Sequence, residues 1–305
     1  MKDMMTETLE RRPYGHTDEP VTVIGLGGSS LDKHSLAGGI ATVRRALELG
    51  IRYFDTSPAY GRGGSQVILG NALEGRTEPY LLATKLGYLA TSSAFRSPDA
   101  LRAQLWENLR ALRRSQVDIL QIHLAEWACW WEEGAPWNQR INLDQAYDFA
   151  NAPAMQVLRE AKAQGICRFI GITADHADEL AYVLRYVEVD ASLVAYDYTL
   201  LSRRALRRAL PLAREKGVAY IAAGVIKSIG AHEGRSPDSR LNELHKASGL
   251  SLVTLTIRYL IADPAITTIL VGAATPEELE ESVVAAQAGP LPSDLHQAVE
   301  DLALP

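Results

Sequence analysis

Cysteine is scarce in this sequence, and basic residues are in deficit. There are two cysteines, Cys129 and Cys167, in 305 residues, and no Cys-x-x-Cys pair. We expect two reduced thiols rather than a disulfide framework or a zinc site. Lysine and arginine number 31 against 37 aspartates and glutamates, which gives a net charge of −6. Because proteins that bind polyanions usually carry a basic excess, nucleic acid is not an expected partner.

Long apolar stretches are missing as well. The N-terminal segment MKDMMTETLERR lacks the apolar centre of a secretory signal. The most apolar stretch, residues 250–262, contains Arg258 and is too short to cross a bilayer. These absences predict a cytoplasmic protein that has no membrane partner.

Motifs of three enzyme classes are also absent. The glycine fingerprint of a Rossmann dehydrogenase begins at Gly25 and Gly27, but Ser30 stands where its third glycine is required. No early strand carries the His-x-His pair of a metal-dependent barrel hydrolase. The Gly-x-Ser-x-Gly motif of a serine hydrolase is not found either. We therefore predict no metal site.

Apolar residues make up 47% of the chain and charged residues 22%, as in an average globular protein. Short runs rich in β-branched residues alternate with longer amphipathic runs. Strands are predicted at 21–25, 52–55, 80–85, 117–122, 169–172, 191–196, 218–223 and 267–271. Helices are predicted at 41–49, 65–73, from the N-cap Ser97 and Pro98 onward, at 154–164, up to Arg185, at 203–216 and at 276–287.

Eight strands alternating with helices, without a break in composition, predict one parallel-sheet domain. The number favours a (β/α)8 barrel over 1–305 with its core at about 21–288. An open doubly wound sheet is the competing architecture. We expect the tail after Pro290 to add a short loop at most.

One connection, residues 125–152 after the fourth strand, is far longer than usual. It holds four of the five tryptophans: Trp127, Trp130, Trp131 and Trp137. Such residues are costly to expose, so we predict a wall over the barrel mouth that stacks on a flat or sugar-like substrate. Alternatively, they pack the loop onto its own barrel or lie in a subunit contact.

Three consecutive predicted strands end in polar residues, namely Asp55, Lys85 and His123, and Tyr60 follows five residues after Asp55. A barrel carries its site at the carboxyl ends of its strands, so these side chains are expected at one rim. A buried ammonium favours a phenolate, and a carboxylate would hold that ammonium in place. Such a phenol can exchange a proton with a carbonyl or alcohol oxygen, while any hydride must come from a cofactor.

Taken one at a time, these residues have structural explanations: a rim salt bridge, a turn aromatic, a hydrogen-bonded histidine. Their combination resembles the aldo-keto reductase superfamily of nicotinamide-dependent barrels. The resemblance covers about 21–288 and rests on FDTSPAYG at 54–61, ATK at 83–85, DILQIH at 118–123 and GIT at 171–173. The motif DTSP at 55–58 and the motif Gly-Leu-Gly-Gly at 25–28 are most similar to the branch that contains L-galactose dehydrogenase and D-threo-aldose dehydrogenase.

The resemblance implies a role for each of the four residues. Tyr60 would be the general acid and base, and Lys85 would tune it. Asp55 would pair with Lys85, and His123 would position the substrate. The implied activity is an NAD(P)-dependent interconversion of a carbonyl and an alcohol, in a sugar, lactol or other small polar aldehyde. The alternative is a nicotinamide-binding regulatory subunit on the same barrel.

The resemblance also implies a cofactor across the barrel mouth. The family's Ser-Asn and Gln that hold the carboxamide correspond to Thr173, Ala174 and Leu193 here, so backbone groups or Asp175 would have to compensate, or binding would be weaker. Lys227, in the loop 224–228, would meet the pyrophosphate, and Glu281 the adenine. The implied contacts are Gly27, Gly28, Asp55, Thr173, Gly224, Val225, Lys227, Gly272, Ala274, Glu278 and Glu281.

Cofactor choice depends on the segment after the last strand. Gly272, Ala274 and Glu278 stand where family members that hold NADP tend to have Lys or Arg. A carboxylate repels the 2′-phosphate and accepts from a ribose hydroxyl, so NAD is predicted over NADP. Glu278 also completes a capping-box pattern with Thr275, and helix capping is therefore a second interpretation of it.

Overall fold

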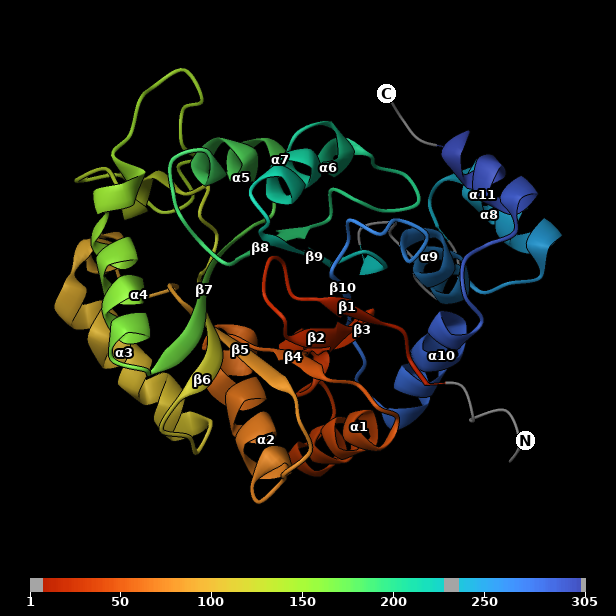
Figure 1. The fold of residues 1–305 in the computed structure, drawn as a ribbon, viewed down its shortest axis with the longest axis horizontal. Helices are drawn as coiled ribbons and strands as arrows, with labels where there is room; N and C mark the ends of the chain where they lie inside the picture. The colour runs from red at the N-terminus through yellow and green to blue at the C-terminus, as the bar shows by residue number, and fades with distance from the viewer. Residues whose placement is uncertain (1–7, 228–235, 303–305) are drawn as a thin grey trace.

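Eight parallel strands close into a barrel at the centre of the molecule, and helices surround it (Figure 1). The computed structural model describes residues 8–227 and 236–302. Around the barrel the order is β10, β3, β4, β5, β6, β7, β8, β9. The strands are β3 (Ile24–Gly27), β4 (Tyr53–Asp55), β5 (Leu81–Leu86), β6 (Val117–Ile122), β7 (Cys167–Ala174), β8 (Ala191–Ala195), β9 (Ala219–Ala223) and β10 (Thr268–Val271). The predicted (β/α)8 barrel is confirmed.

The helices follow the strands as expected for this fold. They are α1 (Leu36–Glu48), α2 (Gly64–Leu73), α3 (Pro98–Ala111), α4 (Pro153–Ala163), α5 (Ala177–Leu184), α6 (Arg204–Arg207), α7 (Ala209–Glu215), α8 (Ser239–Ser248), α9 (Leu252–Leu260), α10 (Pro276–Gln287) and α11 (Ser293–Glu300). Ser97 caps α3, as predicted, by accepting from the backbone N–H of Ala100 at 3.2 Å. Within the described residues, no helix is long and apolar enough to cross a bilayer.

The N-terminal region differs from the prediction. The strand predicted at 21–25 belongs to two elements, because the chain bends at Val23 between β2 (Pro20–Thr22) and β3. β2 pairs antiparallel with β1 (Arg11–Pro13) in a hairpin. Tyr14 in its turn is fully buried, and its ring centroid lies 6.0 Å from that of Tyr53 in the barrel interior. The hairpin therefore closes the amino-terminal end of the barrel.

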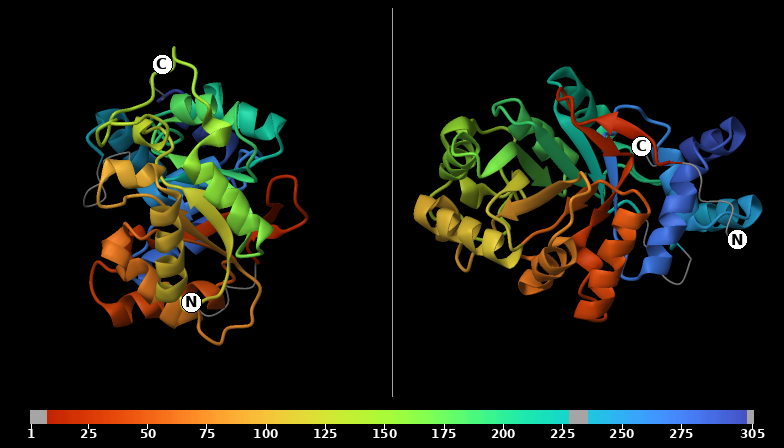
Figure 2. Two further views of the ribbon diagram at one scale, coloured as in Figure 1. Left: turned by 90° about the vertical axis from the view of Figure 1, so that its left-hand side faces the viewer. Right: turned by 60° about the horizontal axis from the view of Figure 1, so that its bottom comes forward.

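The C-terminal region corrects two further predictions. The helix predicted at 203–216 is broken at Arg208, whose backbone (φ −142°, ψ −56°) is not helical. The tail after Pro290 forms helix α11 rather than a loop, and α11 packs beside α8 outside the ring (Figures 1 and 2).

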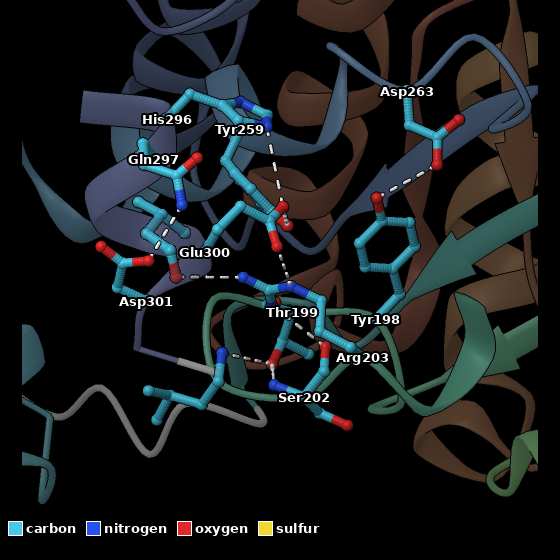
Figure 3. A network of polar contacts seen from close by, with 12 residues as sticks. Tyr198, Thr199, Ser202, Arg203, Tyr259, Asp263, His296, Gln297, Glu300 and Asp301 are labelled. Atoms are coloured by element: carbon cyan, nitrogen blue, oxygen red, sulfur yellow. Dashed lines mark hydrogen bonds and ion pairs between the residues drawn. The ribbon is translucent and has the colours of Figure 1, made fainter. Parts of the chain in front are cut away.

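A buried arginine ties α11 to the barrel (Figure 3). The Arg203 guanidinium donates to the carbonyl of Val299 at 3.2 Å and to that of Thr199. It also lies 3.5 Å from the Glu300 carboxylate and 4.5 Å from the ring centroid of Tyr259. The contacts of Arg203 with Val299, Glu300 and Tyr259 are long-range in sequence, which explains why the local pattern did not reveal the helix.

Strand alternation aims the polar residues of the strand ends into the barrel mouth. Side chains two residues apart on a strand point to the same side. Tyr53, Leu81 and Ile119 belong to the apolar cluster inside the barrel. Asp55, Lys85 and His123 stand two or four residues further along the same three strands. The barrel interior is thus apolar towards the amino ends of these strands and charged at their carboxyl ends.

Candidate active site

A buried ion pair lies at the base of the barrel mouth. The Lys85 ammonium contacts Asp55 Oδ1 and donates to the carbonyl of Thr56 at 3.0 Å. Gln121, on β6, donates to the other carboxylate oxygen of Asp55 at 2.9 Å. Asp55 and Lys85 are 1% and 0% exposed. Both charges are therefore neutralised by named partners away from water, as a buried pair requires.

A tight turn after β4 places Tyr60 next to this ion pair. Tyr60 begins the 3-10 helix Tyr60–Gly63, in which Gly61 and Gly63 have φ of 57° and 91°. Glycine adopts these left-handed conformations without the steric cost that other residues carry. The turn places the Tyr60 ring centroid 4.8 Å from Lys85 Nζ and 5.7 Å from the His123 ring centroid.

His123, at the carboxyl end of β6, completes the group. Its Nδ1 lies 3.0 Å from Ser57 Oγ, and the ring of Tyr88 stands against it with centroids 4.7 Å apart. Nε2 has no protein partner among the residues that the structure describes. The four predicted residues, from three neighbouring strands and one turn, therefore converge on one place.

Burial and charge set the protonation of these groups. Burial lowers the pKa of Lys85, but Asp55 and, after it, Tyr60 raise that pKa by more than burial lowers it. The pKa of Lys85 is therefore raised, and the ammonium is retained. Burial raises the pKa of Asp55, and the ammonium of Lys85 and the amide of Gln121 oppose that rise. Burial, with the positive charge of Lys85, holds the pKa of His123 well below its usual value, so the imidazole is neutral.

Tyr60 differs from its prediction in one respect. From the sequence, Lys85 is expected to lower the pKa of Tyr60. Burial raises that pKa, Lys85 offsets only part of the rise, and the result is a raised value. Without a ligand, Tyr60 is therefore a protonated phenol, and Lys85 limits the cost of its ionisation rather than ionising it.

An aromatic row extends from His123 along one side of the mouth. The ring centroid of Tyr88 lies 5.2 Å from that of Trp127, which lies 5.3 Å from that of Trp137. We call Tyr88, Trp127 and Trp137 the aromatic wall. Tyr88 was not predicted from the sequence. The available signal was the position of Tyr88, three residues after Lys85 and past the end of β5. Figure 1 and the left view of Figure 2 show the yellow-green segment between β6 and α4 projecting from the ring of helices.

Two of the four predicted tryptophans serve the loop itself. Trp130 is 0% exposed, donates from Nε1 to the carbonyl of Leu124 at 3.0 Å and packs on Phe95 with centroids 4.3 Å apart. Trp131 packs on Phe149 at 4.6 Å. Trp130 is thus corrected from a substrate contact to a support, because its ring is sealed beneath the loop. The alternative interpretation of the four tryptophans was that they pack the loop onto its own barrel. Trp130 and Trp131 have this role.

Comparison with known proteins decides the family. Residues 23–303 match the aldo/keto reductase family. The chain belongs to this family. L-galactose dehydrogenase of Arabidopsis thaliana is 32% identical over 301 residues, covering 91% of this chain and 88% of the relative. D-threo-aldose 1-dehydrogenase of a Pseudomonas species is 26% identical over 283 residues, covering 79% and 81%.

A solved structure gives the same fold. The holo form of an aldo-keto reductase from Bacillus halodurans superposes with a TM-score of 0.78 at 23% identity, over 97% of each chain. The resemblance to the family and to its sugar-dehydrogenase branch is confirmed. The protein is an oxidoreductase enzyme.

The predicted cofactor residues of this aldo/keto reductase include an open stretch of backbone. Gly27 and Gly272 lie at or just past the carboxyl ends of the adjacent strands β3 and β10. A Cβ on Gly272 would meet only Ser30 Oγ, at 3.4 Å, and one on Gly27 would come no closer than 3.5 Å to any atom. Gly28 is different, because a Cβ there would lie 2.3 Å from Ser65 Oγ. Packing therefore requires a glycine at position 28.

Thr275 is the N-cap of α10, as the second interpretation requires, whereas the Glu278 carboxylate accepts from the residue before the cap and not from the cap itself. Glu278 Oε2 accepts from the backbone N–H of Ala274 at 2.7 Å, and Thr275 Oγ1 accepts from the N–H of Glu278 at 3.3 Å. The side chain nevertheless remains exposed. Glu281 accepts from Ser251 at 2.5 Å.

The loop after β9 presents different groups. Lys227 is exposed, whereas the side chain of Val225 is buried. At Gly224 (φ 63°) a Cβ would lie 2.5 Å from the ring of Tyr196, which covers this turn. Tyr196 was not predicted from the sequence.

The carboxamide positions are partly occupied by protein contacts. Thr173 Oγ1 accepts from the backbone N–H of Leu124 at 3.2 Å, and the N–H of Asp175 donates to Glu126 Oε1 at 2.9 Å. The backbone N–H of Asp175 is therefore not free to replace the family's side chains. Glu126, which the sequence argument missed, is 2% exposed, and its Oε2 has no partner among the described residues.

Glu126 predicts a pH-dependent stability. Burial raises its pKa from 4.5 to about 7. Because the folded value is the higher one, the cost of ionisation is absent below pH 4.5, grows as pH rises, and is complete above 7, at about 3 kcal/mol. Glu126→Gln keeps the acceptor for Asp175 and should make the protein more stable at pH 8 but not at pH 4.5.

Urea unfolding at a series of pH values between 4.5 and 8 measures this difference. Glu107→Gln, an exposed glutamate on α3, is the matched control and should follow the wild type at each pH. Parallel curves for wild type and Glu126→Gln would show that Glu126 is ionised in the fold without cost.

Proposed function

We propose that this enzyme interconverts a carbonyl and an alcohol in a small, sugar-like substrate, with a nicotinamide cofactor and with Tyr60 as general acid and base. The observation that carries the proposal is the convergence of Tyr60, Lys85, Asp55 and His123 at the barrel mouth, with an ammonium and a neutral imidazole beside a protonated phenol. This set can supply or remove a proton at an oxygen but cannot supply a hydride.

The side chains divide the proton chemistry among them. In reduction, the Tyr60 hydroxyl gives its proton to the substrate oxygen, and the Lys85 ammonium stabilises the phenolate that remains. Asp55 holds that ammonium in place. His123 donates from Nε2 to the same oxygen and orients it, and the aromatic wall excludes water. In oxidation the phenolate takes the proton back. The cofactor, when bound, supplies or accepts the hydride.

The described residues fit a dinucleotide. The bare backbone at Gly27 and Gly272 leaves room for an extended ligand, and Lys227 offers a cation to its phosphates. Thr173 and Tyr196 would face the nicotinamide end, and Glu281 and Glu278 the adenosine end. Near the ribose, the exposed carboxylate of Glu278 favours a hydroxyl over a phosphate, so we propose NAD in preference to NADP.

The substrate class follows from the wall and from the relatives. Aromatic rings pack on the apolar faces of sugar rings while leaving hydroxyls to polar groups. The names of the two relatives above denote dehydrogenases of L-galactose and of D-threo-aldoses. We therefore propose an aldose, oxidised at its lactol carbon, as substrate, with Trp127 and Trp137 against its ring.

Assays with NAD and NADP on a panel of aldoses test the proposal. We expect turnover with NAD and at least about tenfold weaker binding of NADP, from the charge repulsion at Glu278. Glu278→Gln should strengthen NADP binding several-fold and leave NAD binding nearly unchanged.

The position of Glu278 in the first turn of α10 needs a separate control. Thr275→Ala weakens the cap of this helix but keeps the carboxylate. If Thr275→Ala changes the NADP preference as much as Glu278→Gln does, Glu278 acts only through the start of this helix. Absence of turnover across the panel, together with measurable NAD binding, would reject the aldose.

A further inference from the structure

Ser57 is a buried residue whose hydroxyl has no part in the proton transfer proposed for Tyr60. It follows β4 in the sequence Asp55-Thr56-Ser57 and is 0% exposed. Its Oγ has two partners in the described residues: it accepts from the backbone N–H of Ala59 at 3.1 Å, and it lies 3.0 Å from His123 Nδ1. The carbonyl of Ser57 accepts from the backbone N–H of Tyr60 at 3.1 Å.

The hydrogen count at this hydroxyl has one complete solution. A serine hydroxyl has one O–H and two lone pairs, and the N–H of Ala59 uses one lone pair. Within the described residues, His123 Nδ1 is the only acceptor within hydrogen-bond distance of Ser57 Oγ. If Nδ1 carried the hydrogen, the O–H of Ser57 would be buried without a partner, which costs free energy. The satisfied arrangement is therefore O–H to Nδ1, with Nδ1 as acceptor.

A neutral imidazole carries one hydrogen, so an accepting Nδ1 puts that hydrogen on Nε2. We propose that Ser57 is a positioning residue that fixes His123 in the Nε2–H tautomer, with Nε2–H aimed at the substrate oxygen. Its carbonyl fixes the first residue of the Tyr60 turn at the same time. One residue thereby sets both groups that meet the reacting oxygen. The role in turnover rests on the proposed function; the tautomer does not.

Nitrogen-15 NMR of the histidine side chains tests the tautomer directly. The enzyme has seven histidines, and a His123→Gln sample assigns the signal of His123. At pH 7 the wild type, without ligand, should show a protonated Nε2 and an unprotonated Nδ1. Ser57→Ala should give a mixture of the two tautomers, and Ser57→Thr, which keeps the hydroxyl, should restore the wild-type pattern. A wild-type spectrum with the hydrogen on Nδ1 overturns the proposal, whether or not any variant folds.

Kinetics then tests the consequence for turnover. Loss of one buried hydrogen bond at the orienting group should lower kcat about five- to tenfold in Ser57→Ala and leave the Kd of NAD unchanged. Ser192→Ala, which removes another fully buried serine hydroxyl, bonded to the carbonyl of Ala219 in the barrel wall, is the control and should keep its kcat. An unchanged kcat in Ser57→Ala overturns the positioning role. A wild type without turnover would instead count against the proposed function, and the spectrum would still decide the tautomer.

Discussion

Tyr60→Phe should lower kcat by about a thousandfold, because it deletes the one group that can exchange a proton with the substrate oxygen. The ring stays, so its packing against His123 and its place over Lys85 are kept. The Kd of NAD, measured by quenching of tryptophan fluorescence, should therefore remain within about threefold of the wild type. Loss of kcat with retained cofactor binding is the expected signature of an acid–base role.

Tyr80→Phe provides the matched control. Tyr80 is a half-buried tyrosine whose hydroxyl accepts from Arg114 at 2.8 Å, and its ring packs on Phe54. Its variant loses the same oxygen outside the mouth and should turn over normally. If Tyr60→Phe kept more than about a tenth of the wild-type kcat, below the usual size of general acid–base catalysis, Tyr60 would not be the acid.

The raised pKa of Tyr60 fixes the direction of the pH dependence. Reduction needs the phenol, which is present at every pH below that pKa, so its rate should be level through neutrality and fall only in alkali. Oxidation needs the phenolate, so the rate of oxidation should rise with pH from neutrality into alkali. Tyr60→Phe should show neither slope.

The barrel and its four convergent residues could be predicted because their signals are local. Strand periodicity sets which side chains face inward, and the fold itself brings the ends of neighbouring strands together. Asp55, Lys85 and His123 needed nothing more than this. The Thr275 cap and the Ser97 cap were equally local.

The features that were missed depend on contacts between distant segments. Trp130 is buried because Phe95, on another loop, lies against it. Helix α11 is held by Arg203 from nearly one hundred residues earlier in the chain. Burial is also a property of the whole fold, which is why Lys85 alone gave the wrong direction for the pKa of Tyr60.

Lys85→Met should destabilise the fold by about 3–5 kcal/mol, because it leaves the Asp55 carboxylate buried without its cation. Methionine preserves the length of the side chain, so the loss reports charge rather than volume. The pKa of Asp55, which burial already raises in the wild type, would then rise further above its value in the unfolded chain. Stability is retained at low pH, where Asp55 is protonated in both states, and is lost as pH rises. Urea unfolding at pH 4 and pH 8 should show the larger deficit at pH 8.

The double variant Lys85→Met/Asp55→Asn separates stability from chemistry. It removes both charges together, and the asparagine oxygen still accepts from Gln121, so most of the lost stability should return. Turnover should not return, because the phenolate of Tyr60 has no ammonium to stabilise it. A double variant as unstable as Lys85→Met would mean that packing, and not an unpaired carboxylate, caused the loss. A double variant with near wild-type kcat would remove Lys85 from the proton chemistry altogether.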